Sequence, residues 1–239
     1  MSDFETITVP ARLCGYPGVG FGGYVAGVLA SRAAAKTVRV DFRRPVPTDS
    51  PVRLAPTPAG GAELTGGDAL LAAAAPAEPA VEAPPAPSWE QASAAADSYR
   101  AAPPDGMVDC FGCGLHRTPD TGLRLHCGRI PGTPLVAAAW TPGPGVGDAG
   151  GMLPAELVWG ALDCPGNAAG RLLDDRRAGA VTASLTARLL RPVPIGSRLV
   201  SYAWMLGSDG RKYRVGTALA TADGDLCALA EALWVEPRA

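Results

Sequence analysis

A repeated segment constrains the fold of this chain more than any other feature of its sequence. Residues 42–54 are FRRPVPTDSPVRL and residues 189–201 are LLRPVPIGSRLVS, so the tetrapeptide RPVP occurs twice, 147 residues apart. The elements around each copy follow one order: a glycine-bearing loop, an apolar helix, a strand, the RPVP turn and a meander of strands. An internal duplication explains both the tetrapeptide and the order. The fold class is therefore α+β, with one helix lying across an antiparallel sheet in each half.

A segment rich in proline and alanine separates the two halves. We assign residues 1–76 to the N-terminal half, residues 77–106 to this connector and residues 107–239 to the C-terminal half. Residues 88–91 (SWEQ) have the spacing of a capping box, which predicts a short helix over residues 88–100. We expect the connector to lie outside the core and to run from one half to the other.

Charge and composition exclude several classes of protein. The formal net charge is −2 and no dense basic cluster occurs, so we expect no nucleic-acid partner. No apolar run approaches the roughly 20 residues that span a bilayer, and the acidic N-terminus lacks the features of a signal peptide. We expect a cytoplasmic protein with no membrane partner, and the sequence leaves a homodimer open. Hydrophobic residues make up 47% of the chain, enough for a substantial core.

The first candidate for chemistry is a carboxylate at the end of an apolar helical stretch, residues 153–169. Apolar residues recur there at helical spacing, which predicts a helix from Pro154 to Asp163. The tripeptide CPG that follows ends or kinks it. An acid that closes an apolar run is solvated, paired or functional, and this segment alone does not decide between these interpretations.

In the N-terminal half, Gly22 and Gly23 open an apolar segment that predicts a helix to about Ala35. Glycines at a helix start let a ligand approach closely and leave N–H groups available. The same pair is also compatible with a plain joint between a loop and a helix.

The six cysteines do not form the pattern of a disulfide framework. Cys110 and Cys113 make a CxxC near His116 and His126, and residues 123–129 after it are predicted to be a strand. A zinc site would lack a second CxxC or a CxxH partner, and a redox role would need a thioredoxin-like context. We interpret the CxxC as a structural turn with reduced thiols, and we expect no metal and no cofactor.

Three motifs together resemble the hotdog-fold acyl-CoA thioesterases. GFGGYVAGVLA (residues 20–30) is similar to the start of their central helix, which a His-Gly-Gly opens and in which an acid follows. CFGCG with the later GLRLH, and ALDCPGNAA followed by a strand and an RPVP turn, resemble the C-terminal half of the same superfamily. The resemblance implies a double hotdog, in which one continuous sheet wraps around two central helices.

The motif of the single-domain members is divided between the two halves of this chain. In those members the acid lies nine residues after the histidine. Here Phe21 stands at the position of the histidine, Gly22 and Gly23 match the glycines, and Ala30 stands at the position of the acid.

The C-terminal half has the complementary pattern. Asp163 matches the acid, but Pro-Ala-Glu at residues 154–156 replaces His-Gly-Gly. Hotdog active sites lie between two helices, so the resemblance implies one complete site, made of Gly22, Gly23 and Asp163. The opposite, pseudo-symmetric site would be empty.

The resemblance also implies roles for these residues. Asp163 would act as a general base or as a nucleophile on an acyl thioester of coenzyme A or of an acyl-carrier protein. The amides of Gly22 and Gly23 would stabilise the oxyanion, and the neighbouring Tyr24 would line the pocket.

Some families of the superfamily add a hydroxyl and a glutamine near the acid. Thr182 or Ser184, on the strand after the helix, would supply the hydroxyl. The only glutamine, Gln91, lies in the connector. We therefore expect an acyl thioester hydrolase. The alternative is a catalytically silent hotdog protein that binds an acyl group or serves as a structural partner.

Overall fold

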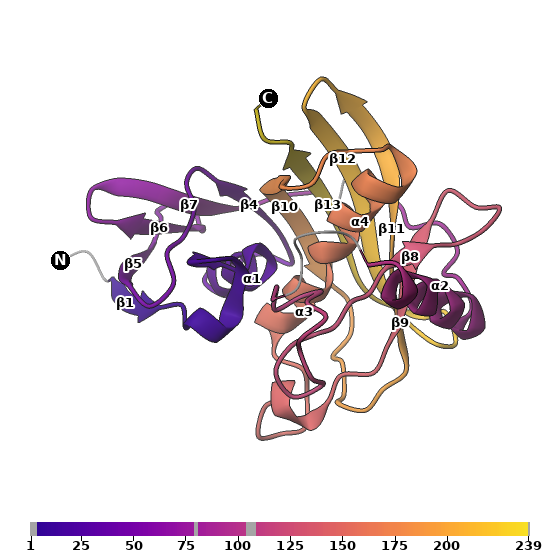
Figure 1. Cartoon of the computed structure of the whole chain (residues 1–239). Coiled ribbons are helices and arrows are strands. Elements are labelled where there is room, and N and C mark those ends of the chain that lie inside the picture. Colours follow the sequence, from indigo (N-terminus) through magenta and orange to yellow (C-terminus); the bar gives the residue numbers. More distant parts are fainter. Residues whose placement is uncertain (1–3, 79–80, 104–108, 239) are drawn as a thin grey trace.

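The structure is a computed structural model that describes residues 4–78, 81–103 and 109–238 of the 239-residue chain. Its main feature is a single antiparallel sheet of eleven strands within these ranges, which runs through both halves (Figure 1). The strands are β1 (Glu5–Thr8), β4 (Thr37–Phe42), β5 (Pro51–Pro56), β6 (Ala62–Gly66), β7 (Ala69–Pro76), β8 (Gly128–Arg129), β9 (Val136–Trp140), β10 (Val181–Leu189), β11 (Leu199–Asp209), β12 (Lys212–Thr221) and β13 (Leu226–Val235). A separate hairpin pairs β2 (Cys14–Tyr16) with β3 (Val19–Gly20).

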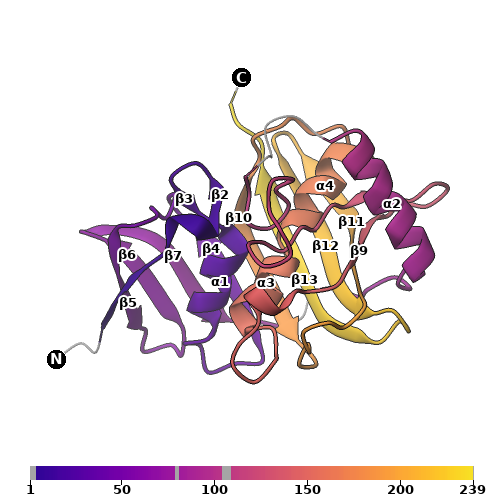
Figure 2. The same cartoon turned by 60° about the horizontal axis from the view of Figure 1, so that its bottom comes forward.

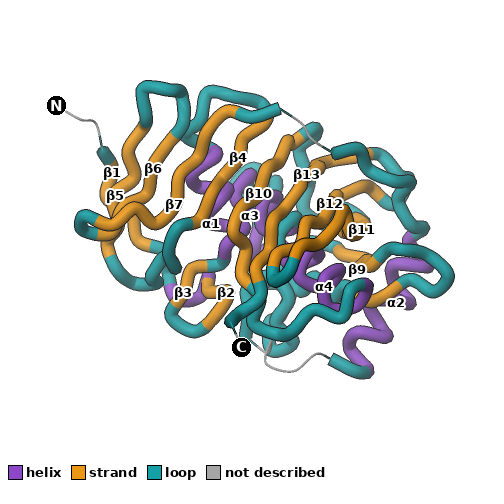
Figure 3. Tube along the Cα trace, turned by 90° about the horizontal axis from the view of Figure 1, so that it is seen from above, coloured by secondary structure: helices purple, strands orange, loops and turns teal. Residues whose placement is uncertain are grey.

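The two halves join where β4 pairs with β10. The spatial order is β1-β5-β6-β7-β4-β10-β13-β12-β11-β9-β8, so strands in matching order spread from this junction to either side. The helices are α1 (Gly22–Ala30), α2 (Trp89–Ala101), α3 (Ala155–Ala161) and α4 (Cys164–Leu173). Figures 2 and 3 show α1 and α3 side by side on one face of the sheet, near its centre. The expected α+β architecture, one continuous sheet around two central helices, is present.

Equivalent hydrogen bonds around the two RPVP turns support the duplication. The Gly20 N–H donates to the Val46 carbonyl at 2.8 Å, and the Leu153 N–H donates to the Val193 carbonyl at 2.8 Å. In each case the residue two positions before a central helix is bonded to the valine of its RPVP turn. Each turn also bonds to its meander in the same way. The N–H groups of Arg43 and Arg44 both donate to the Leu71 carbonyl, and those of Leu190 and Arg191 both donate to the Cys227 carbonyl.

The two central helices cross at unusually close range because glycines line the contact. A Cβ on Gly23 would lie 2.7 Å from the Cα of Gly160, and a Cβ on Gly27 would overlap the backbone of Glu156. Only residues without a side chain allow these backbones to touch. This crossing brings the start of α1 to the end of α3.

Helix α1 is shorter than the sequence predicts and ends at Ala30 instead of about Ala35. Beyond it, the Ser31 hydroxyl donates to the Val28 carbonyl at 2.8 Å, and the Ala34 N–H donates to the Gly60 carbonyl at 3.1 Å. The alanine-rich tail therefore docks on the turn between β5 and β6, which overrides its helix propensity.

The CPG tripeptide kinks the second helical stretch and does not stop it. Helix α3 ends at Ala161, and α4 begins at Cys164 and runs for ten residues. Pro165 is tolerated in the first turn of α4, where a missing N–H leaves no helical hydrogen bond unmade. Asp163 consequently lies at the joint of two helices and not at a free helix end.

Residues 123–129 do not form the strand that the sequence predicts. Only Gly128–Arg129 of this segment joins the sheet, as β8. The N–H groups of Leu123 and Leu125 donate to the carbonyls of Phe111 and Gly112, each at 2.8 Å. The segment thus pairs with the CxxC turn instead of the sheet, and it fixes that turn against the core.

The connector is packed more closely than its composition predicts. Helix α2 has the predicted capping box, in which Ser88 and Gln91 exchange hydrogen bonds. Its residue Ala92 is buried with Tyr202 in a second cluster, apart from the main core. The Tyr202 hydroxyl also donates to the Pro84 carbonyl at 3.0 Å. The connector therefore covers part of the C-terminal half.

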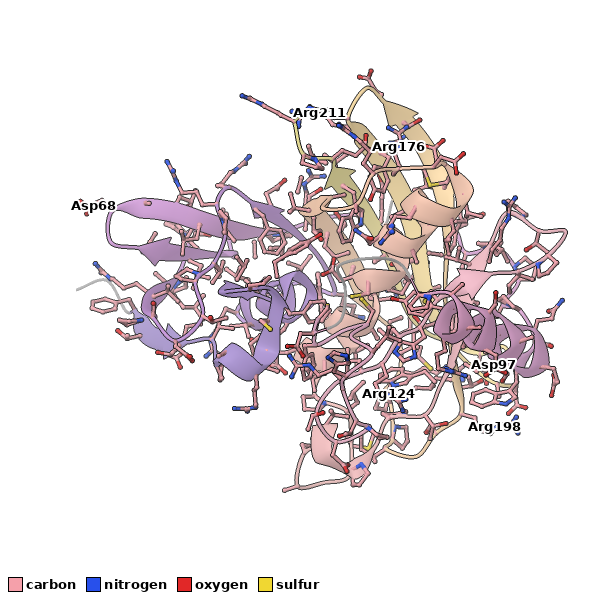
Figure 4. All side chains as sticks on the ribbon, viewed as in Figure 1. Asp68, Asp97, Arg124, Arg176, Arg198 and Arg211 are labelled. Carbon is pink, nitrogen blue, oxygen red and sulfur yellow. The ribbon has the colours of Figure 1, made fainter. Side chains whose placement is uncertain are left out.

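An ion pair and a hydrogen bond to Glu236 anchor the chain just after the last strand. Figure 4 shows Arg176 and Arg211 at the same end of the C-terminal half. Arg176 pairs with the carboxylate of Glu236 at 3.3 Å, and Arg211 donates to the Glu236 carbonyl at 2.6 Å. Within the described ranges, no helix has the length and apolar character needed to cross a membrane.

Candidate active site

The Asp163 carboxylate is buried at the joint of α3 and α4, and it binds groups from two distant elements. Its side chain is only 3% exposed. Oδ2 accepts the N–H of Gly23, at the start of α1, at 2.8 Å. Oδ1 accepts the hydroxyl of Thr182, on β10, at 2.7 Å. The structure thus brings together a glycine of the N-terminal half with an acid and a hydroxyl of the C-terminal half.

The surroundings of Asp163 raise the pKa of its carboxyl toward neutral pH. Burial raises the pKa of the carboxyl from 3.8 to about 6, against the lowering effect of the hydrogen bonds from Thr182 and Gly23. A carboxyl with a pKa near 6 is mostly ionised at neutral pH, yet it is far more basic than an exposed aspartate. These are the properties of a general base.

The start of α1 offers fewer donors than the sequence predicts. The Gly23 N–H is committed to Asp163, so it is not available to an oxyanion in this arrangement. The N–H groups of Gly22 and Tyr24 are not bonded to other residues in the described parts of the chain. A Cβ on Gly22 would lie 3.0 Å from Oδ2 of Asp163 and 3.5 Å from the Thr182 hydroxyl. Gly22 therefore leaves space beside the carboxylate.

Asp163, Thr182 and Gly22 all line a cavity of about 420 Å³. The other residues that line it include Tyr16, Phe42, Arg43, Arg44, Cys110 and Trp234. A second cavity, of about 380 Å³, is lined by Tyr99, Cys113, Leu125, Arg129, Arg171 and Leu172. Cys164 and Asn167 line both cavities and therefore lie between them. The volumes are those of small-molecule sites.

Two of the predicted site residues do not direct their side chains to the carboxylate. Leu185 and Ala187 of β10 pack in the core, so strand alternation places Ser184 on the opposite face. An irregularity in pairing between Thr182 and Ser184 returns Thr182 to the face of the helices. The side chain of Tyr24 packs against the core and lines neither cavity.

The pseudo-symmetric position has a different composition. Ala30 stands where an acid would lie on α1, and α3 begins after Pro154, with Glu156 in its first turn. In the alignment of the two halves, Ala155 and Glu156 stand where Gly22 and Gly23 stand on α1, and a carboxylate at that helix start repels an anion. Among the described residues, this position therefore offers neither the acid nor the two glycines of the first one.

Sequence reasoning missed the residues that complete the cavity wall. Arg43 and Arg44 are exposed and belong to the first RPVP turn, whose repetition was a usable signal. Tyr16 enters from the β2–β3 hairpin, where its hydroxyl donates to the Ala180 carbonyl at 2.7 Å. No sequence signal marked this hairpin as part of a site.

Comparison with known proteins identifies the fold. No family model matches the sequence, and no curated protein matches it. Solved structures match nearly the whole chain. The TesB protein of Mycobacterium avium subspecies paratuberculosis has a TM-score of 0.62 and 16% identity, and the match covers 92% of this chain and 89% of that one. The acyl-CoA thioesterase II TesB2 of Mycobacterium marinum has a TM-score of 0.61 and 12% identity, with 99% and 93% covered.

A third structure carries the name of the fold itself. It is a conserved protein of unknown function with a hot dog fold from Alicyclobacillus acidocaldarius, with a TM-score of 0.55 and 12% identity, and the match covers 99% of this chain and 94% of that one. Identities this low show the architecture and not the reaction. The chain has the double-hotdog fold that its motifs predict.

Proposed function

We propose that the protein hydrolyses an acyl thioester of coenzyme A or of an acyl-carrier protein, with Asp163 as general base. The observation that carries this proposal is the buried carboxylate held by Gly23 and Thr182 in a cavity beside the start of α1. Two matching structures bear thioesterase names, TesB and acyl-CoA thioesterase II, which is consistent with this chemistry.

The role proposed for Asp163 is that of a general base. Each carboxylate oxygen of Asp163 already accepts one hydrogen bond, and each keeps a lone pair for a water proton. In the proposed step Asp163 takes a proton from water as the water oxygen attacks the thioester carbon. The tetrahedral intermediate then collapses, the C–S bond breaks, and Asp163 returns the proton to the leaving thiolate.

The start of α1 would stabilise the charge that forms on the carbonyl oxygen. The N–H of Gly22 is not bonded to another described residue, and Gly22 lines the cavity. Helix N-termini favour anions because their first N–H groups lack helical partners. At the cavity rim the exposed Arg43 and Arg44 would pair with phosphates of the acyl carrier.

A hydrolysis assay over short, long and aromatic acyl-CoAs and acyl-carrier proteins tests this function. Asp163→Asn keeps the shape of the side chain and removes the base, so kcat should fall by about 10²- to 10⁴-fold on the best substrate. The matched control is Asp68→Asn, because Asp68 is exposed and lies at the far tip of the N-terminal half (Figure 4). Wild-type turnover by the Asp163→Asn variant would remove Asp163 from the mechanism.

A silent acyl-binding protein is the second candidate, and two observations favour it. Phe21, at the position of the motif histidine, is buried. Gln91 caps α2 with Ser88 and is not at the site. Tight binding of an acyl-CoA without turnover, unchanged in Asp163→Asn, would identify this function.

A further inference from the structure

Three cysteine thiols from two separate segments meet at the wall between the two cavities. Cys110 and Cys113 belong to the CxxC turn, and Cys164 is the first residue of α4. Their sulfur atoms all lie within 4.8 Å of one another, and all three residues are buried. The sulfurs of Cys110 and Cys164 are 3.7 Å apart. Hydrolysis as proposed above uses none of these thiols.

The CxxC turn has the form of a metal-binding loop. The Gly114 N–H donates to the Cys110 carbonyl at 2.7 Å, which closes the turn and holds Cys110 and Cys113 on one side of it. A Cβ on Gly112 would overlap the sulfur of Cys164, so the glycine leaves the space that the third sulfur occupies.

The turn is also held rigidly. The Phe111 N–H donates to the Cys14 carbonyl, and the Phe111 carbonyl accepts the Leu123 N–H, each at 2.8 Å. A site whose ligands are fixed before binding loses little entropy when it takes a metal.

The sulfur separation fits a tetrahedral metal and not a disulfide. A zinc–sulfur bond of about 2.3 Å places two thiolates of a tetrahedron about 3.8 Å apart, whereas a disulfide bond is about 2.05 Å long. The observed 3.7 Å between Cys110 and Cys164 corresponds to the edge of such a tetrahedron.

We propose that Cys110, Cys113 and Cys164 bind one zinc ion, with the fourth position occupied by water from the cavity of Asp163. The sequence predicted no metal because the CxxC lacked a partner pair, and the fold supplies Cys164, 54 residues away from Cys110. Binding requires the three thiols to be deprotonated, so it releases protons to solvent. Zinc is favoured because it binds thiolates in tetrahedral geometry, and zinc sites with an open position have three protein ligands and a water.

The metal would also position the base. Asp163 directly precedes Cys164, so a zinc ion that ties Cys164 to the CxxC turn fixes the chain next to the carboxylate. Zinc is here a positioning element and not a participant in hydrolysis. The zinc site therefore stands or falls independently of the proposed reaction.

Metal analysis of the full-length protein tests the site. After expression with zinc and purification with a reductant and no chelator, we expect one zinc per chain by mass spectrometry. Cys110→Ser, Cys113→Ser and Cys164→Ser should each lower zinc content at least about tenfold. Cys227→Ser should keep it, because Cys227 is buried on β13 outside the cluster. Cobalt in place of zinc should give a thiolate-to-cobalt charge-transfer band and the intense d–d bands of a tetrahedral site.

Two results would overturn the site. One is three free thiols and less than a tenth of an equivalent of metal after incubation of the wild-type protein with excess zinc and desalting. The other is a disulfide between Cys110 and Cys113 or Cys164, found by mass spectrometry of the protein purified without reductant. The stoichiometry and cobalt spectrum of the wild type decide the question even where a serine variant fails to fold.

Discussion

At the scale of single residues, two opposing effects act on Asp163. Burial disfavours its charge and raises the pKa to about 6, while the hydrogen bonds from Thr182 and Gly23 favour the charge. Burial is the larger effect. The carboxylate is therefore held in a defined orientation and remains basic enough to accept a proton near neutral pH.

Thr182→Val should shift the pH dependence of activity. Loss of the hydroxyl removes a hydrogen bond that lowers the pKa of Asp163, so the acid limb of the kcat/KM profile should move upward by about one pH unit. Thr182→Ser keeps a hydroxyl and should retain most of the profile. Thr186→Val, on the same strand but outside the cavity, is the control. An unchanged profile for Thr182→Val would separate Thr182 from the base.

Asp163 should also make stability depend on pH. Its pKa is higher in the folded than in the unfolded chain, so between about pH 4 and 6 the folded state binds more protons and the free energy of unfolding falls as pH rises. The loss is on the order of 2–3 kcal/mol and is complete above about pH 6. Urea unfolding at pH 4.5 and 7.5 should show this loss in the wild type, and a smaller one in Asp163→Asn. Equal losses in the two proteins would contradict a raised pKa.

The resemblance to known motifs predicted part of this site, and local geometry determined the rest. Gly22, Asp163 and Thr182 were predicted and lie together. The irregularity in β10 that separates Thr182 from Ser184 left no mark in the sequence, because a strand pattern does not show where its register shifts. The hydrogen bond from the Gly23 N–H to Asp163 likewise depends on the crossing of α1 and α3, which the sequence does not show.

At the scale of elements, the crossing of α1 and α3 determines where the site forms. Gly27→Ala should destabilise the fold, because the new Cβ would overlap the backbone of Glu156 and force the helices apart. Such overpacking costs about 1–3 kcal/mol, which exceeds the gain of at most about 1 kcal/mol in helix propensity. Thermal unfolding measures the difference.

Gly15→Ala is the matched control for this variant. Its Cβ would find the nearest atom, the Cα of Phe21, at 3.4 Å, an ordinary contact. A Gly27→Ala protein as stable as the wild type would mean that the helices tolerate a wider crossing.

Strands proved easier to predict than the segments that pack around them. Strands β4 and β13 lie where alternation and turn signals in the sequence mark strands. Residues 123–129 have the same alternation but pair with the CxxC turn, a competing partner that periodicity does not show. The contact between Cys164 and Cys110 arises from the same docking.

At the scale of the whole molecule, the two halves have equivalent backbone frames, each made of a central helix, an RPVP turn and a meander, but different residues at the motif positions. Gly20 and Leu153 make the same hydrogen bond to their RPVP valines, so the frames match even where the side chains differ. The halves differ at the motif positions, because one has the glycines and the other has the acid. The division was predictable from the sequence once the repeat was aligned with a known motif.

An acid placed at the pseudo-symmetric position should not restore activity. The double variant Ala30→Asp, Asp163→Asn has a carboxylate on α1, opposite the start of α3. There Ala155 and Glu156 stand in place of the two glycines, and the Glu156 carboxylate would repel a developing oxyanion. Its kcat/KM should stay within about threefold of Asp163→Asn alone, while Ala30→Asp with Asp163 intact should keep near wild-type activity and so show that the added acid is tolerated. A recovery of more than about tenfold in the double variant would mean that the second frame can also form a site, and that the asymmetry resides in the acid alone.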